Sequence, residues 1–137
     1  MFGWLKRRKH PLPRFPSTIK EIFETFCSTK IEGVEAEDLS ALLSEYMKEI
    51  REKAENNPSL DLPLAEAIED RLNFLIKNFD DYDQKQKSLI IGAVRYFAYA
   101  SDPYSEEEFA TGFFDDAKVL NYVLEELGHL DSCIDLR

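Results

Sequence analysis

Residues 84–99 are apolar on nearly every side of the helix that their spacing predicts. Leu89, Ile91, Val94 and Phe97 fall on different faces of that helix, so little of its surface is left for water. A helix of this kind is stable in water only where other helices surround it. The segment therefore predicts a helical bundle in which residues 84–99 form a central helix.

Four further segments place apolar residues three and four positions apart, the spacing of a helix with one buried face. They cover residues 17–32, 35–56, 64–79 and 114–127. No segment alternates apolar and polar residues convincingly as a strand does, and 137 residues is the size of one ordinary domain. We therefore expect an all-α, single-domain bundle of about five helices.

The first 16 residues differ from the rest of the chain in composition. Prolines at positions 11, 13 and 16 exclude a regular helix and favour an extended backbone. This segment holds five lysine or arginine residues and no acid, a charge of +5; because the whole chain carries −10, residues 17–137 carry −15. The sequence predicts an irregular, proline-rich basic arm over 1–16, a helical domain over 17–130 and a short tail over 131–137.

Several residues are placed to begin or end the predicted helices. Thr18 with Glu21 has the spacing of a capping box, and Asp83 directly precedes the central helix. Gly128 follows the last apolar residue of the fifth helix, where glycine commonly ends a helix. These residues set the expected limits of the first, fourth and fifth helices.

Features of secreted proteins are missing from the sequence. No apolar segment of about 7–15 residues, as a signal peptide requires, follows the basic N-terminal residues. The 2 cysteines are too few for a disulfide framework. We therefore expect a cytoplasmic protein in which Cys27 is a small buried apolar residue and Cys133 is incidental.

The sequence contains no recognisable catalytic arrangement. It has no nucleophile with a base at a known spacing, no metal-ligand pattern and no glycine-rich phosphate loop. His129, near the end of the fifth predicted helix, is more typical of a stabilising cation than of a catalyst. The acidity of residues 17–137 disfavours nucleic acid, because phosphate binding depends on Lys and Arg releasing counterions. These features favour a non-enzymatic protein.

One group of aspartates invites a calcium interpretation. Asp80, Asp81 and Asp83 lie close together, as oxygen ligands of calcium do. Counted from Asp80, however, the sixth and twelfth positions lack the glycine and the glutamate of an EF-hand loop. A solvated loop that caps the central helix is therefore the better interpretation.

A second group of aspartates is a candidate site for a divalent cation. Asp102, Asp115 and Asp116 flank the loop between the two last predicted helices and could together bind a cation or activate water. In the alternative interpretation Asp102 starts a turn, and Asp115 or Asp116 lies at the start of the fifth helix, where free N–H groups favour an acid. That alternative requires no cofactor.

Aromatic residues are concentrated around the same loop, at more positions than a core of this size requires. Exposed, they would form a protein-interaction surface; the alternative is that they pack the loop against the bundle. The basic arm combines apolar and cationic residues, which suits an acidic groove, a membrane surface or the acidic body of the same chain. The candidate interaction residues are Tyr99, Tyr104, Phe109, Phe113 and Phe114, with Trp4, Lys6, Arg7, Arg8 and Lys9 in the arm.

An apolar helix, Asp102-Pro103, Gly112-Phe113, Asp115-Asp116 and a second apolar helix follow one another within residues 88–127. This order resembles the YkvA-like domain, a small bacterial family of unknown function. The sequence departs from the family over residues 104–109, where members usually have a second Pro-Asp or Ile-Pro element. The resemblance implies a helical hairpin and no established activity.

Three functional hypotheses follow. The leading one is a non-enzymatic protein-interaction or regulatory domain that binds a basic protein, because opposite charges speed association. The second is a carboxylate metal-binding domain or metal-dependent hydrolase built on Asp102, Asp115 and Asp116. The third is an inhibitor or immunity-type protein for a basic partner. A homodimer and a weak contact of the arm with a membrane surface stay open as well.

Overall fold

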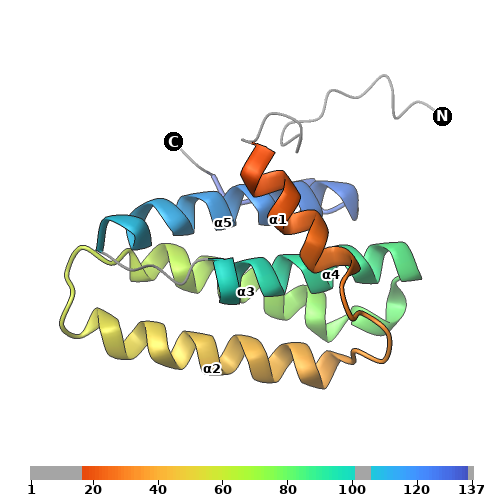
Figure 1. The fold of residues 1–137 in the computed structure, drawn as a ribbon, viewed down its shortest axis with the longest axis horizontal. Helices are drawn as coiled ribbons and strands as arrows, with labels where there is room; N and C mark the ends of the chain where they lie inside the picture. The colour runs from red at the N-terminus through yellow and green to blue at the C-terminus, as the bar shows by residue number, and fades with distance from the viewer. Residues whose placement is uncertain (1–16, 101–105, 136–137) are drawn as a thin grey trace.

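The computed structural model describes residues 17–100 and 106–135 (Figure 1). Within these ranges the chain forms five α-helices and no strand, which confirms the predicted all-α bundle. The helices are α1 (Ser17–Ser28), α2 (Ala36–Ala54), α3 (Leu62–Lys77), α4 (Gln84–Arg95) and α5 (Glu106–Glu126). Short 3₁₀ turns, η3 (Phe79–Asp81) and η5 (Leu130–Ser132), and a π-helical turn, η4 (Tyr96–Ala100), complete the fold.

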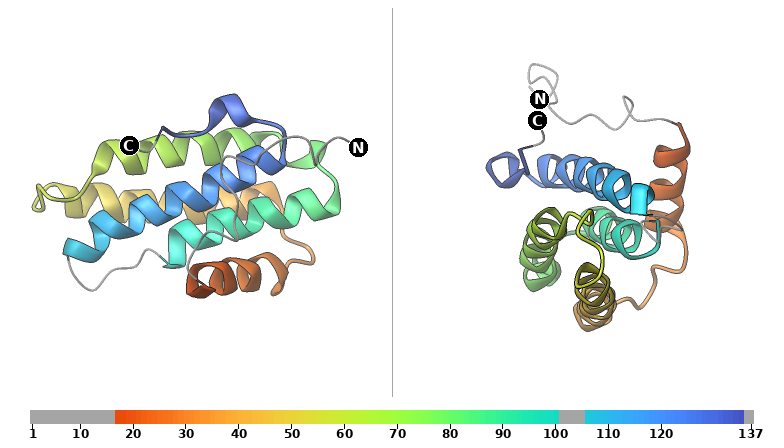
Figure 2. Two further views of the ribbon diagram at one scale, coloured as in Figure 1. Left: turned by 90° about the horizontal axis from the view of Figure 1, so that it is seen from above. Right: turned by 90° about the vertical axis from the view of Figure 1, so that its left-hand side faces the viewer.

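Helix α4 lies in the middle of the bundle, as its apolar sequence predicts. Seen end on, it is surrounded by α1, α2, α3 and α5, and it contacts all four (Figure 2). Ile90, Ile91, Ala93 and Val94 are buried around its circumference. Among the described helices, none is both long enough and apolar enough to cross a bilayer.

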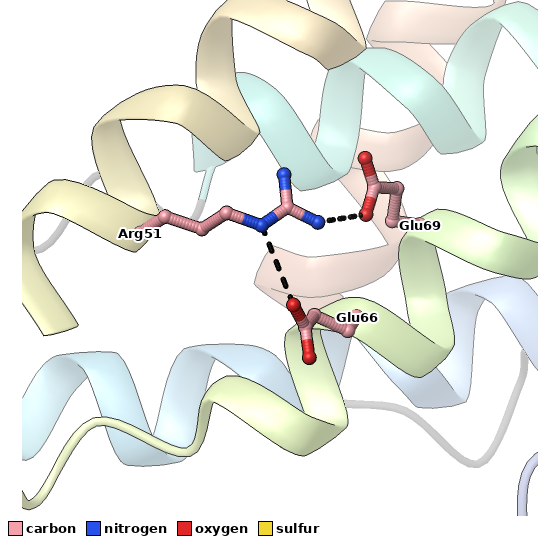
Figure 3. A network of polar contacts seen from close by, with 3 residues as sticks. All are labelled: Arg51, Glu66 and Glu69. Atoms are coloured by element: carbon pink, nitrogen blue, oxygen red, sulfur yellow. Dashed lines mark hydrogen bonds and ion pairs between the residues drawn. The ribbon is translucent and has the colours of Figure 1, made fainter.

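Helices α2 and α3 form an antiparallel pair that is bridged at its surface by one arginine. Arg51 of α2 donates from Nη2 to Glu69 at 2.6 Å and from Nε to Glu66 at 3.3 Å, both on α3 (Figure 3). The arginine and Glu66 are about half exposed, so solvent screens the pairs and their effect on stability is small. Beneath them, Leu43, Met47 and other side chains of α2 pack in the apolar core.

Helix α1 crosses α4 at Gly92. A Cβ atom built on Gly92 would lie 2.2 Å from Sγ of Cys27 and 3.1 Å from Cε1 of Phe23, so the two helices approach too closely there for any side chain. Cys27 is half-buried in this contact. Burial raises the pKa of its thiol to about 12, with a smaller contribution from Glu24. The thiol therefore stays protonated at neutral pH and acts as a small packing group.

The C-terminal end of α1 is bound by Arg95 of α4. The Arg95 guanidinium donates to the carbonyl oxygens of Phe26 at 3.1 Å, Thr29 at 2.5 Å and Lys30 at 2.9 Å. The last carbonyl groups of a helix have no partners within the helix, and a cation is stabilised by them. Arg95 therefore fixes the end of α1 on α4.

Several helix ends follow the predicted chemistry. Asp83 begins α4 with a reciprocal capping box, in which its carboxylate accepts from the N–H of Gln86 at 2.8 Å. Gly128 ends α5 with a positive φ of 85°, and the N–H of His129 bonds the carbonyl of Leu124 at 2.7 Å. That pattern is a Schellman motif, in which glycine accepts the left-handed conformation at little cost.

Two predicted helix starts were wrong. Helix α3 begins at Leu62, because Asp61 accepts a hydrogen bond from the N–H of Leu64 and Pro63 fits the first turn. Helix α5 begins at Glu106, so Gly112-Phe113 lies inside the helix and does not form a turn before it. Asp115 and Asp116 consequently lie in the helix interior, and neither occupies its first turn.

The C-terminal segment is hydrogen-bonded to α5 through one buried amide side chain. Asn121 is fully buried; its Nδ2 donates to the carbonyl of Ile134 at 2.9 Å and its Oδ1 accepts from the N–H of Ile134 at 2.7 Å. Arg71 of α3 donates to the carbonyl of Ser132. Cys133, expected to be incidental, packs half-buried against the core beside Asn121.

Candidate functional site

The end of α4 departs from α-helical geometry at the place where the aromatic residues gather. Tyr96–Ala100 forms a π-helical turn, a rare conformation that is frequent at functional sites. Tyr96, Phe97 and Ala98 are buried, whereas Tyr99 has 54% of its surface exposed. The Tyr99 ring leans on Phe26 of α1, with 5.9 Å between the ring centroids.

A hollow of about 210 Å³ lies between this turn and α2. Leu42, Tyr46 and Glu49 line it from α2, and Ala98 and Tyr99 line it from the π-turn. The three α2 residues are spaced four and three apart, so they share one face of the helix. Tyr46 is held there by edge-to-face packing of its ring on Phe97, at 4.9 Å between centroids. The hollow is thus formed by α2 and the π-turn, which pack on each other through Tyr46 and Phe97.

A second hollow continues from the first along α2. It is lined by Glu49, Glu52, Lys53, Asn56 and Asn57 and has a volume of about 360 Å³. Glu49 lines both hollows, so the two adjoin on the surface of α2 between the π-turn and the end of the helix. We call the two adjoining hollows the α2 groove and define it by these residues: Leu42, Tyr46, Glu49, Glu52, Lys53, Asn56, Asn57, Ala98 and Tyr99.

The charged residues of the groove are mainly acidic. Two exposed carboxylates, Glu49 and Glu52, line it against one cation, Lys53, and Glu45 lies one turn before Glu49 on the exposed surface of the same helix. Arg51, the nearest arginine in sequence, is committed to Glu66 and Glu69 on α3. A groove with aromatic and aliphatic walls and carboxylates at its rim offers favourable contacts to an alkyl chain that ends in a cation.

The aromatic residues predicted to form an interaction surface do not share one environment. Tyr99 is exposed at the groove, and Phe114 has 37% of its surface exposed, with Nζ of Lys118 at 5.5 Å from its ring centroid. Phe113 is fully buried against Phe97 and contributes to the core. The remaining predicted residues lie outside the part of the chain whose side chains the structure describes: Tyr104, Phe109, Trp4, Lys6, Arg7, Arg8 and Lys9.

The carboxylates of Asp116 and Asp115 on α5 lie near enough to Tyr96 to affect its phenol. Asp116 is 3% exposed and Tyr96 is 6% exposed. Burial raises the pKa of the Tyr96 phenol, and the charges of Asp116 and Asp115 raise it further. A phenol with a raised pKa stays protonated at neutral pH and cannot act as a general base. Tyr96 is therefore a packing residue and does not abstract protons.

The aspartate site predicted for a divalent cation is only partly described. Asp102 lies outside the described residues, and Asp115 and Asp116 are adjacent on α5. Across residues 17–100 and 106–135, no three acidic, histidine or cysteine side chains come together as metal ligands do.

The substitution Asp115→Asn tests the role of the more exposed aspartate. Burial raises the pKa of the Asp115 carboxyl, opposed in part by Lys118, so the folded protein holds this proton more tightly than the unfolded chain does. The ionised carboxylate therefore opposes folding at neutral pH. We expect the variant to be more stable than the wild type at pH 7, by no more than about 0.5 kcal/mol after solvent screening.

The gain from Asp115→Asn should disappear as the pH falls through the folded-state pKa and below the ordinary aspartate value of about 3.9, where the carboxyl is protonated in both states. Urea unfolding at neutral and acid pH, with and without magnesium or manganese, measures both effects. A metal ligand would behave in the opposite way: the wild type would gain stability from the ion and the variant would not.

His129 has a structural role. Its Nε2 lies 2.8 Å from the Tyr82 hydroxyl, and its ring packs edge to face on Phe74 of α3 at 5.2 Å. The histidine thereby joins the C-terminal turn to α3 and to the segment that precedes α4. The sequence contains no signal for this contact, because Tyr82 and His129 are 47 positions apart.

Comparison with known proteins identifies no relative of this chain: no protein-family model, no curated protein and no solved structure matches it. The resemblance of residues 88–127 to the YkvA-like domain therefore stays a prediction.

Proposed function

We propose that this protein is a non-enzymatic interaction domain that binds a basic segment of a partner protein in the α2 groove. The observation that supports it most directly is that the exposed Tyr99 and the carboxylate of Glu49 line one hollow together with Leu42 and Tyr46. A lysine or arginine side chain has the matching chemistry: its alkyl stem packs on apolar and aromatic surface while its cation meets the carboxylate.

The charge of the domain supports the same conclusion. Residues 17–137 carry −15, so a basic partner is attracted from a distance and an acidic one is repelled. The groove adds local specificity, because Glu49 and Glu52 line it and Glu45 lies one turn away on the exposed surface of the same helix. The expected complex forms quickly and weakens as salt is added. We place this interaction in the cytoplasm, where two unpaired cysteines are ordinary.

The proposal is tested with a fluorescein-labelled peptide in which four consecutive lysine or arginine residues follow a tryptophan. Fluorescence anisotropy at low and high salt measures its affinity for the full chain. We expect Glu49→Lys to weaken binding at low salt by about tenfold or more, a change of about 1.4 kcal/mol. The single variant Tyr99→Ser should also weaken peptide binding, because it removes the aromatic ring that the cation contacts.

Glu32→Lys provides the matched control, because Glu32 is exposed in the loop before α2 and the substitution changes the net charge equally. It should alter affinity only slightly. Equal losses in the two charge-reversal variants would show that net charge alone attracts the peptide, and would contradict a binding site in the groove.

A further inference from the structure

We propose that the basic arm of the same chain, residues 1–16, occupies the α2 groove and competes there with the partner. This inference rests on the proposed function of the groove and adds its regulation. The arm is +5 and the rest of the chain is −15, so the two attract each other. Phe2, Trp4 and Leu5 directly precede Lys6, Arg7, Arg8 and Lys9, which combines in one short segment the apolar and cationic groups that the groove suits.

The groove fits such a segment at two points. The hollow beside Tyr99 has an aromatic and aliphatic lining that suits an apolar side chain or an alkyl stem. The adjoining hollow carries two carboxylates, Glu49 and Glu52, against one cation, Lys53, so its lining is net acidic and suits the cations that follow. The groove follows α2 toward the C-terminal end of that helix, so an extended segment can meet both hollows in turn.

The arm is long enough to reach the groove of its own chain. It is tethered at Ser17, the first residue of α1, and α1 is fixed to α4 through Gly92 and Arg95. Lys6 to Lys9 lie 11 to 8 residues before Ser17, so when extended they can lie up to roughly 26–36 Å from it. Ser17 is nine residues before Phe26, about 14 Å along α1, and the Phe26 ring lies 5.9 Å from the Tyr99 ring, so the groove is within that reach. Tethering also supplies an effective concentration in about the millimolar range, which an external peptide must exceed.

Trp4 reports on the arm directly, because it is the only tryptophan of the chain. We expect the Trp4 emission of the full chain at low salt to be shifted to the blue of the emission of a free peptide with the sequence of residues 1–16. The shift should be independent of protein concentration and should be lost at high salt, in Glu49→Lys and in Tyr99→Ser. Glu32→Lys should retain it. Circular dichroism confirms that the helical content of each variant is unchanged.

Three results would overturn the inference. Trp4 emission equal to that of the free peptide would place the arm outside any apolar contact, and a shift that grows with protein concentration would assign the groove to the arm of a second copy. A blue shift that persists equally in Glu49→Lys and Tyr99→Ser would place the arm on another surface, and would likewise contradict it.

A further variant separates this inference from the proposed function. Substituting Lys6, Arg7, Arg8 and Lys9 together by glutamine should remove the blue shift and raise the affinity for the labelled basic peptide by about tenfold or more. Equal affinity of the wild type and this variant would contradict competition by the arm while leaving the groove as a binding site. Failure of both proteins to bind the peptide would contradict the proposed function itself.

Discussion

Replacing Gly92 with valine is expected to lower the free energy of unfolding by about 3 kcal/mol or more, the upper range for overpacking a core. The physical reason is the crossing of α1 over α4. Even a single added methyl group would lie 2.2 Å from Sγ of Cys27 and 3.1 Å from the Phe23 ring, so α1 must move away. Urea unfolding followed by circular dichroism measures the loss.

Substituting Cys27 tests whether its sulfur atom causes this loss. Gly92→Ala should cost less than the valine variant, about 1–3 kcal/mol, and Cys27→Ala in the same chain should recover part of that loss because it removes the sulfur atom. Gly128→Ala is a control of equal chemistry: its cost of about 1 kcal/mol comes from its φ of 85° alone, since nothing lies within 4 Å of an added Cβ. An equal effect at positions 92 and 128, without coupling to Cys27, would contradict the close helix crossing.

Asn121→Ala is expected to destabilise the protein by about 2–3 kcal/mol. The substitution removes two hydrogen bonds with the backbone of Ile134 and leaves a buried N–H and a buried carbonyl without the side chain that satisfied them. Hydrogen exchange should accelerate at the Ile134 amide more than at amides within α2.

Asn73→Ala is the control for Asn121→Ala, because Asn73 is exposed on α3 and its truncation should change stability by less than about 0.5 kcal/mol. If exchange at Ile134 is unchanged in Asn121→Ala, the C-terminal segment must be held by other contacts, such as Arg71 with Ser132.

The sequence predicts well those features that depend on local chemistry. The central position of α4 follows from apolar residues on all its faces, and the starts of α4 and the end of α5 follow from Asp83 and Gly128, whose roles involve only neighbouring residues. Helix α5 begins earlier than the sequence predicts: Gly112 suggests a turn, but it lies inside the helix. A glycine within a helix costs about 1 kcal/mol, and burial of Phe113 in the core offsets that cost.

The candidate site is harder to predict from sequence, because its residues are brought together only by the tertiary fold. Tyr99 was identified from its aromatic neighbours, but the π-turn that exposes it depends on tertiary packing around Tyr96 and Phe97. Glu49 resembles every other glutamate on α2 in sequence, and only the fold places it between two hollows. Asn121 looks like a polar interruption of an apolar helix until Ile134 is brought beside it.

The most direct test of the central claim is a nuclear magnetic resonance titration of the ¹⁵N-labelled full chain with the basic peptide at low salt. Our account predicts that the largest amide shift changes fall on residues 42–57 of α2 and its exit and on residues 98–99 of the π-turn. Residues 129–134, at the C-terminal turn, should change little. Largest changes at the C-terminal turn, or changes spread evenly over all acidic surfaces, would contradict a binding site in the α2 groove.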